Sequence, residues 1–429
     1  MFRACVCVLL TPALVTGFVG PSATAQPCTP ALDSAVGGTL DGAVLALRLG
    51  GAPPAADLIL GGEFLTIGGV AASHVARYDG VSFAPLGPGL NGAVRALELF
   101  NGEPVAAGAF TSDGSTALTR AARWTGAAWA SMGSGLNADA FALLSADLGG
   151  GASLYASGQF TTAGGLAAVG AARWDGSAWS ALGGGLVGDA KVGLALASHD
   201  DGRGPALFVG GSFLGAGSTP SANIVRWDGL AWSAVGAGLN GPVRALTEFN
   251  GRLIAGGDFT AANGVGGAAR LAVWDGSAWA EFAGGANGPV RALTVITPVG
   301  GAPILVAGGE FTVIGGVAAV RVAMYDGVVW SPLDAGSASI VRALARRDDD
   351  LYLGANATTP VGSSAPALLR WTLCVSGLPG DLNNDGMVNG ADISVILSNW
   401  GQTGVLGDLN NDGAINGADI SVILSNFTG

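Results

Sequence analysis

One six-residue pattern recurs through most of this chain and limits what it can fold into. It reads aromatic, Asp, Gly, any two residues, aromatic, as in Trp174-Asp175-Gly176-Ser177-Ala178-Trp179. Copies with small changes span residues 78–83, 124–129, 174–179, 227–232, 274–279 and 325–330. Asp-Gly between two apolar runs is a strong hairpin signal, because a type I′ turn needs positive φ at both central residues. The pattern therefore predicts six β-hairpins in a repeat protein.

Two further landmarks accompany each hairpin at a mean spacing of about 50 residues, within the range of propeller repeats. A strand of the Val-x-Ala-Leu type begins at Val44, Val94, Ala140, Val192, Val243, Val290 and Val341. A second strand ends in Gly-x-Phe at Phe64, Phe110, Phe160, Phe213, Phe259 and Phe311. Each unit thus holds four short strands, which predicts a mainly β fold and a β-propeller of four-stranded blades. A parallel β-helix is the alternative for a Gly-rich repeat, but it would not need Asp-Gly hairpins.

The paired aromatic residues have two interpretations. A row of tryptophans is suited to stacking against sugars, whereas packing between blades would bury the rings in the core. A binding site is usually confined to a few blades, whereas core residues must recur in every blade. Repetition in every unit therefore favours the packing interpretation.

The number of blades depends on how the two ends of the repeat region meet. Six units are complete, and the seventh begins at residue 340 and reaches Trp371 without an Asp-Gly turn or a final strand. Residues 28–38 match the end of a unit and precede the first Val-x-Ala-Leu strand. We therefore expect residues 28–38 to supply the outer strand of the last blade, giving seven blades; six blades plus a loose strand is the alternative.

The same alignment predicts a strand register. A two-residue turn places Trp174 opposite Ser177, and the aligned N-terminal strand then places Ala31 opposite Trp371. Antiparallel partners keep a constant sum of residue numbers, so Cys28 falls opposite Cys374. Facing cysteines on neighbouring strands lie at a spacing compatible with a disulfide. We therefore predict a Cys28–Cys374 bridge.

The N-terminus predicts export of the chain. Arg3 is followed by an apolar run from Ala4 to Val19 and by a small-x-small site at 23–25. This is typical of a secretory signal peptide over residues 1–25, although a retained membrane anchor is the alternative. We expect a secreted or cell-surface protein without a membrane span after cleavage, its propeller over residues 26–375. A formal net charge of −12 argues against nucleic acid as a partner.

After a linker at residues 376–379 the propeller-type repeat gives way to a different one. Residues 380–392 recur almost unchanged at 407–419, with oxygen side chains at loop positions 1, 3, 5, 9 and 12 and glycine at position 6. This spacing predicts two Ca²⁺ loops, each with a backbone carbonyl ligand at position 7. A pair of Asn/Asp-rich surface turns is the alternative. The predicted ligands are Asp381, Asn383, Asp385, Met387, Asn389 and Asp392 in the first loop, and Asp408, Asn410, Asp412, Ala414, Asn416 and Asp419 in the second.

Each loop leads into an apolar segment with helical spacing, at residues 393–400 and 420–427. This duplicated half-EF-hand, over residues 380–429, resembles a type I dockerin domain. The resemblance implies folding that depends on two Ca²⁺ ions and a cohesin-like protein domain as partner. Gly390-Ala391 and Gly417-Ala418 stand where such domains often carry Ser-Thr. The propeller repeats more loosely resemble kelch-type repeats and those of fungal cortical polarity markers, which implies fold alone.

Catalytic activity would require polar residues that do not recur in every unit. His74 and His199 are the only histidines, and we interpret them as loop residues. Arg95, Arg244, Arg291 and Arg342 recur near the inner strand, either in structural salt bridges or lining the channel to bind an anion. No catalytic constellation is recognisable. We therefore expect a secreted, non-catalytic propeller for binding or display, attached to its partner through the dockerin-like module. A carbohydrate-active enzyme of the glycoside hydrolase type, or a carbohydrate-binding protein in polysaccharide breakdown, is the alternative.

Overall fold

The computed structural model describes residues 32–33, 36, 40–50, 57–262, 265–298, 302–347, 350–356, 367–372, 380, 382, 388–401, 407–410 and 414–427. The chain divides into two compact units. One spans Thr29–Val375, and the other combines Met1–Cys28 with Ser376–Gly429. The described part of the first unit is mainly β, whereas that of the second holds two short helices.

The described residues of the first unit form seven four-stranded antiparallel sheets. Their first strands are β2 (Val44–Gly50), β8 (Val94–Phe100), β12 (Ala140–Asp147), β19 (Val192–Asp200), β25 (Val243–Phe249), β31 (Val290–Ile296) and β37 (Val341–Arg347). The second strands are β3 (Asp57–Gly62), β9 (Glu103–Gly108), β13 (Ala152–Gly158), β20 (Pro205–Ser212), β26 (Arg252–Gly257), β32 (Ile304–Gly309) and β38 (Asp350–Ala355). The third strands are β6 (Val75–Tyr78), β10 (Ala121–Trp124), β16 (Ala171–Trp174), β23 (Ile224–Trp227), β29 (Leu271–Trp274), β35 (Val322–Tyr325) and β39 (Leu368–Thr372). The fourth strands are β7 (Phe83–Pro85), β11 (Trp129–Ser131), β17 (Trp179–Ala181), β24 (Trp232–Ala234), β30 (Trp279–Glu281), β36 (Trp330–Pro332) and β1 (Leu32–Asp33).

Two-residue strands form small additional ladders, and all but β18 lie within the loops between second and third strands, whereas β18 lies between β17 and β19. They are β4 (Thr66–Ile67) with β5 (Val70–Ala71), β14 (Thr162–Ala163) with β15 (Leu166–Ala167), β18 (Leu186–Val187) with β21 (Gly215–Ala216) and β22 (Thr219–Pro220), β27 (Ala261–Ala262) with β28 (Val265–Gly266), and β33 (Val313–Ile314) with β34 (Val317–Ala318).

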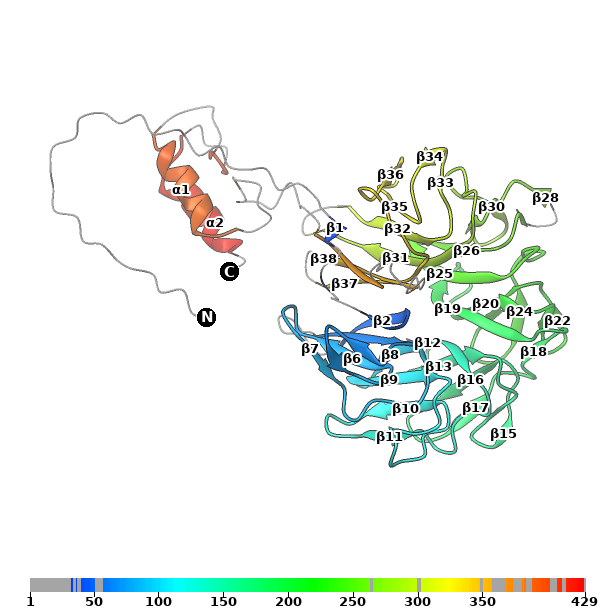
Figure 1. Ribbon diagram of the computed structural model, residues 1–429. Helices are drawn as coiled ribbons and strands as arrows, with labels where there is room; N and C mark the ends of the chain where they lie inside the picture. The colour runs from blue at the N-terminus through cyan, green and yellow to red at the C-terminus, as the bar shows by residue number, and fades with distance from the viewer. Residues whose placement is uncertain are drawn as a thin grey trace, which may run out of the picture. The chain divides into compact units, whose positions relative to one another are not determined.

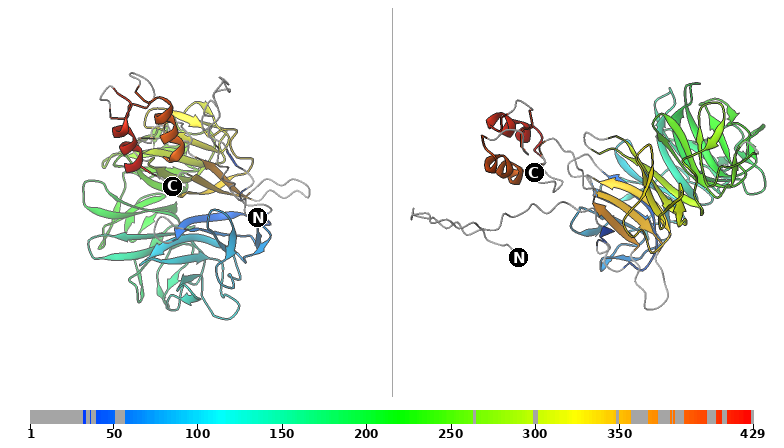
Figure 2. Two further views of the ribbon diagram at one scale, coloured as in Figure 1. Left: turned by 90° about the vertical axis from the view of Figure 1, so that its left-hand side faces the viewer. Right: turned by 90° about the horizontal axis from the view of Figure 1, so that it is seen from above.

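The first strands lie at the centre of the unit. Each contacts the first strand of the next sheet, and the contacts close a cycle from β2 through β8, β12, β19, β25, β31 and β37 back to β2. Figure 1 shows these strands gathered around a common centre with the outer strands radiating from them, and Figure 2 shows the same ring from two other sides. The propeller-like β fold that the repeat predicts is therefore present.

The last sheet combines both ends of the first unit, in the order β1-β39-β38-β37. An outer strand from within residues 28–38 is therefore present, as predicted. Its register differs from the prediction by one residue, since Leu32 rather than Ala31 lies opposite Trp371 and Asp33 lies opposite Arg370. Cys28 and Cys374 lie outside the described residues, and the register argument that paired them is wrong.

The aromatic-Asp-Gly hairpins are present with longer turns than predicted. Trp174 pairs with Trp179, not with Ser177, so four residues form the loop. The Asp175 carboxylate accepts hydrogen bonds of 2.8 Å from the backbone N–H groups of both Ser177 and Ala178, and Gly176 has φ +105°. An aspartate that satisfies two turn N–H groups stabilises this wider loop, which is why the type I′ expectation failed here.

The aromatic pairs join neighbouring sheets, which confirms the packing interpretation for them. The Trp179 indole N–H donates to the Met132 backbone carbonyl of the preceding sheet at 2.8 Å. Trp129, Trp232, Trp279 and Trp330 make the corresponding bond. The predicted Gly-x-Phe rings are buried as well, with an exposed fraction between 0% and 3%. Recurrent burial of this kind explains why these residue types repeat in every sheet.

The second unit contains helices α1 (Gly390–Ser398) and α2 (Gly417–Ser425), which have the same sequence and contact one another. Among the residues that the structure describes, no helix has both the length and the apolar character to cross a membrane.

Candidate functional site

Each first strand departs from regular pairing near its start, at its second residue in six sheets and at its third residue, Leu194, in β19. In all seven sheets the register skips this residue, which is the mark of a β-bulge. The seven skipped residues all line one cavity of about 180 Å³, and they are Leu45, Arg95, Phe141, Leu194, Arg244, Arg291 and Arg342. The bulges therefore turn one side chain per sheet into the centre of the ring.

The four predicted channel arginines are all in this set, and three of them form ion pairs. Arg95 lies 3.1 Å from the Asp139 carboxylate, which Arg120 shares at 3.4 Å. Arg244 donates to Asp258 at 2.8 Å. Arg291 pairs with Glu310. For these three arginines the structural salt-bridge interpretation is confirmed.

Arg342 differs from the other three. Its Nε donates to the Asn356 Oδ1 at 2.9 Å, and among the described residues no carboxylate lies within salt-bridge distance of it. Burial lowers the pKa of the Arg342 guanidinium, and the positive charges of Arg291 and Arg244 lower it further against the opposing effect of Glu310 and Glu63. Burial is therefore the largest influence on this guanidinium, and the charges around it act in both directions.

A second cavity adjoins the first and shares Leu45, Arg95 and Arg342 with it. It has a volume of about 550 Å³ and is also lined by Asp41, Gly42, Ala43, Glu63 and Asn356. Glu63 follows the second strand of its sheet directly, as Asp258 and Glu310 do in theirs. The first sheet thus has the acid without an arginine, while the last sheet has the arginine without an acid.

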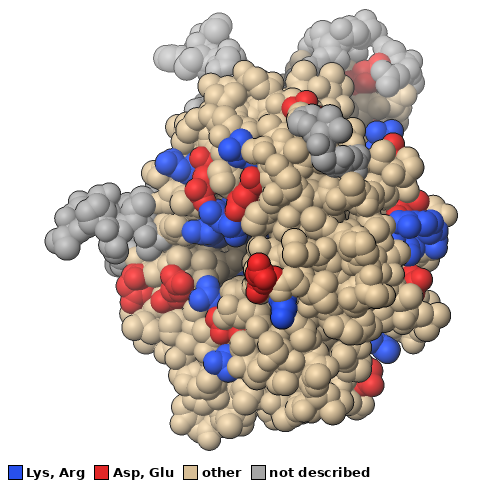
Figure 3. Space-filling view, turned by 90° about the vertical axis from the view of Figure 1, so that its right-hand side faces the viewer, with Lys and Arg blue, Asp and Glu red and all other residues tan. Residues whose placement is uncertain are grey.

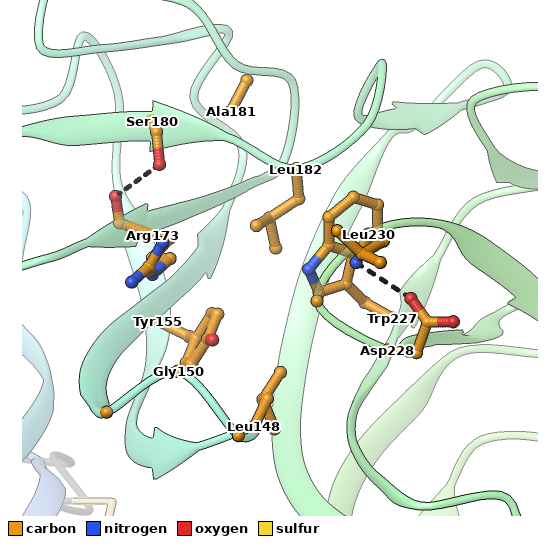
Figure 4. Close-up of a pocket in the computed structure, with 13 residues that line it drawn as sticks. Leu148, Gly150, Tyr155, Arg173, Ser180, Ala181, Leu182, Trp227, Asp228 and Leu230 are labelled. Carbon is orange, nitrogen blue, oxygen red and sulfur yellow. Dashed lines mark hydrogen bonds between the residues drawn. The ribbon is translucent and has the colours of Figure 1, made fainter.

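A third cavity, of about 340 Å³, lies between the third and fourth sheets. Figure 4 shows Leu148, Tyr155 and Arg173 on one side of it and Trp227, Asp228 and Leu230 on the other. Burial raises the pKa of the Tyr155 hydroxyl, although the charge of Arg173 opposes this. Leu230 is 90% exposed in its Asp-Gly turn. Aromatic and apolar side chains therefore share this groove with an arginine and a carboxylate.

Several charged groups outside these cavities form local pairs. His199 lies in β19 rather than in a loop, which corrects the sequence interpretation, and its Nδ1 is 2.7 Å from the Glu248 carboxylate. Arg48 contacts the buried Glu98 at 2.5 Å. On the face shown in Figure 3, basic and acidic side chains lie in small mixed groups within a largely uncharged surface.

The predicted calcium ligands are described in part. Asp381, Asn383, Asp385, Met387 and Asp412 lie outside the described residues, whereas Asn389, Asp392, Asp408, Asn410, Ala414, Asn416 and Asp419 lie within them. Those that are described do not by themselves bring three acidic, histidine or cysteine side chains together.

The two loop ends have the same geometry at their helices. Asn389 caps α1, its Oδ1 accepting from the Ala391 N–H at 2.7 Å, and its own N–H donates to the Asp392 carboxylate at 2.8 Å. Asn416 and Asp419 repeat this capping box at α2. Burial raises the pKa of Asp419, but hydrogen bonds from the N–H groups of Asn416, Asn410 and Leu409 outweigh it and hold the pKa below its ordinary value.

Asp392 and Asp419 are each 0% exposed, so an acidic side chain is buried at the end of both loops. Buried carboxylates need compensating charge or hydrogen bonds. Val388 and Ile415, at loop position 8, are also fully buried. A hard-oxygen donor set around these carboxylates fits Ca²⁺.

Comparisons with known proteins leave the family open. No family model matches the chain, and no curated protein matches it. Among solved structures, the computationally designed Ika8 protein is similar over 78% of this chain and 98% of its own, at 16% sequence identity and a TM-score of 0.44. A likeness at that level carries no argument about function.

Proposed function

We propose that this protein is a secreted seven-bladed β-propeller that binds or displays, attached to a partner through a calcium-dependent, dockerin-like C-terminal unit. The observation that carries the proposal is the exact duplication in that unit. Asn389 with Asp392 and Asn416 with Asp419 form the same capping box at identical helices. A single sequence of ligands, repeated with the same local geometry, is what two equivalent cation sites require.

In this proposal the side chains at loop positions 1, 3, 5, 9 and 12 hold each ion, together with the carbonyl of position 7. Bound Ca²⁺ would supply the positive charge that the clustered carboxylates lack, and so couple ion binding to folding. The buried Asp392 and Asp419 support this assignment, because each ends its loop where the shorter aspartate arm remains within reach of the ion.

The two helices also support a docking role. Leu397 and Leu424 occupy the same position in the two copies and are 57% and 59% exposed. Trp400 and Phe427 are likewise equivalent, at 50% and 48% exposed. Large apolar side chains exposed twice at matching positions are typical of an interaction surface. A cohesin-like protein domain is the proposed partner, with either copy able to dock.

Calcium titration of the full secreted chain tests this proposal. We expect isothermal titration calorimetry to give two Ca²⁺ ions per chain, and the double variant Asp392→Asn/Asp419→Asn to lose both. Ser394→Ala/Ser421→Ala, in the same helices, is the matched control and should retain both. Binding of no calcium, or unchanged binding by the double aspartate variant, would contradict the proposal.

A second candidate function is carbohydrate binding, and the groove between the third and fourth sheets favours it. Leu230 offers an exposed apolar edge beside the largely buried Tyr155 and Trp227, while Arg173 and Asp228 offer hydrogen bonds. Sugars present both apolar faces and hydroxyl groups, and so suit such a lining.

A glycan array combined with a hydrolysis assay tests this second candidate. Leu230→Ser should weaken any glycan signal, whereas Val328→Ser, at the same turn position in another sheet and 81% exposed, should not. Turnover of a glycan would favour the enzyme alternative, and equal signals from both variants would remove the groove from consideration.

A further inference from the structure

The central ring of seven side chains is divided into two kinds of lining. Following the order of the sheets, Arg244, Arg291 and Arg342 are consecutive, and they form what we call the basic arc. Leu45, Phe141 and Leu194 make the rest of the ring apolar apart from Arg95, whose guanidinium lies 5.6 Å from the centre of the Phe141 ring. A single cavity thus has cations on one side and apolar groups on the other.

Within the basic arc the charge balance is broken at one position. Arg244 and Arg291 are matched by Asp258 and Glu310, which directly follow the second strands of their own sheets. Asn356 occupies that position in the last sheet, and an amide can accept a hydrogen bond from Arg342 but cannot neutralise it. A partly buried guanidinium without a counter-charge is costly unless an anion from solution supplies one.

The neighbouring charges do not remove this excess. Asp139 is shared between Arg95 and Arg120, so these three groups together carry one further positive charge. Glu63 and Asp41 are both exposed to solvent on the wall of the adjoining cavity, where water screens them, and Arg342 has no ion pair with either. The cavity therefore keeps a positive potential beside Leu45, Phe141 and Leu194.

We infer that the centre of the propeller binds a small organic anion, with its carboxylate on Arg342 and its apolar body against Leu45, Phe141 and Leu194. The guanidinium presents N–H donors suited to a carboxylate, of which only Nε is used by Asn356. A cavity of about 180 Å³ is smaller than the ~300–1,000 Å³ typical of drug-sized ligands, which restricts the ligand to a small molecule. This inference rests on the proposed binding role of the propeller, but it does not depend on calcium or on the C-terminal unit.

The sequence offers a substitution that separates a binding role from a structural one. Asn356→Asp would give Arg342 the carboxylate that Arg244 already has in Asp258, with almost no change in side-chain size. If Arg342 serves to bind an anion, this variant should be at least as stable as the natural chain and yet lose the ligand. If Arg342 has only a structural role, the Asn356→Asp variant should gain stability and the natural chain should bind no ligand for the variant to lose.

The experiment uses the full secreted chain and phenylacetate as the probe, with the neutral phenylacetamide as its isosteric control. We expect titration calorimetry, supported by saturation-transfer NMR, to detect phenylacetate and to find phenylacetamide at least about tenfold weaker, since a hydrogen bond to a charged group is worth about 1.5–3 kcal/mol. Arg342→Gln and Asn356→Asp should each weaken phenylacetate binding by about tenfold or more. Arg77→Gln, on an exposed pair with Asp57 away from the cavity, should leave it unchanged.

Three results would overturn the inference. They are no detectable phenylacetate binding by the natural chain, equal binding of the amide, and full binding by a folded Asn356→Asp variant. The melting temperature of each variant separates loss of binding from loss of folding. Because the calcium titration probes the other unit, failure of this inference and failure of the proposed function are distinguishable.

Discussion

Both units of this protein are built from sequence repeats, yet the two repeats bury different things. In the propeller the recurrent buried side chains are apolar, such as Phe160, and three of the four central arginines form ion pairs with acids at partly exposed positions. In the C-terminal unit the repeat buries the carboxylates of Asp392 and Asp419 together with Val388 and Ile415. Apolar burial is self-sufficient, whereas buried carboxylates call for a counter-charge. We therefore expect the first unit to be stable without any cation and the second to depend on one.

Removal of calcium should show the largest difference between the units. Excess EDTA should abolish the helical far-ultraviolet circular dichroism of α1 and α2, because the clustered carboxylates then repel one another. The near-ultraviolet signal of the buried propeller tryptophans should persist. Added Ca²⁺ at about 100 times its dissociation constant should stabilise the C-terminal unit by about 2.7 kcal/mol for each occupied site. Simultaneous loss of both signals would show that the units do not differ in this way.

Phe160→Ala should produce the next largest effect, confined to the propeller. The ring is 0% exposed, and such truncations cost about 3–5 kcal/mol through lost burial and the cavity that remains. Urea unfolding followed by tryptophan fluorescence measures this cost, which should be the same with and without Ca²⁺. The exposed Leu166→Ala, at 62% exposure, is the control and should change stability by less than about 0.5 kcal/mol.

Trp179→Phe should have a smaller effect. This change keeps an aromatic ring but removes the indole N–H that donates to the Met132 carbonyl of the neighbouring sheet. The same carbonyl also accepts from the Gly135 N–H at 3.1 Å, so the change removes one of its two hydrogen bonds and should cost about 0.5–1.5 kcal/mol. Hydrogen exchange of the two sheets should show faster local opening at their junction, and a variant with unchanged exchange would contradict the role of this bond.

Mild acid should have the smallest effect. Backbone N–H groups of Ala178 and Ser177, with the Ser177 hydroxyl, lower the pKa of Asp175 to about 2, and those of Ser82 and Val81 lower the pKa of Asp79 to about 2. A depressed carboxyl pKa stabilises the fold above the ordinary value of 3.8 and loses that contribution as the pH falls toward 2. The urea midpoint of the propeller should therefore decline between pH 4 and pH 2, and less so in Asp175→Asn.

The sequence predicted the propeller-like arrangement because the features that build it recur. Phe160, Trp179 and the first strands serve the same purpose in each sheet, so repetition itself revealed their role. The addition of β1 to the last sheet was also predictable, since a missing strand at one end matched a surplus strand at the other. Repetition likewise separated three structural arginines from chemistry, as their ion pairs confirm.

Turn length, strand register and the charge balance around the central arginines were not predictable in the same way. The turn at Asp175 was expected to contain two residues, because Asp-Gly alone does not reveal that the aspartate will bind two N–H groups of a wider loop. The one-residue shift of Leu32 against Trp371 has no counterpart in the other sheets. The sequence left anion binding open for all four recurrent arginines but did not single out Arg342, because the difference at that site is a departure from the repeat. A comparison of Asn356 with Asp258 and Glu310, which hold the same position in their repeats, would have revealed the missing acid.

The position of β39 has a mechanical consequence. The chain leaves the propeller from this strand toward the C-terminal unit, so any tension on an anchored protein would enter there. An edge strand such as β36 is held by one ladder of hydrogen bonds, whereas β39 is held by β38 on one side and by β1 on the other. A force strong enough to extract β39 must break the hydrogen bonds to both β38 and β1. β1 therefore reinforces the strand that would carry the load, and the propeller should resist force applied at β39 better than force applied at an outer strand such as β36.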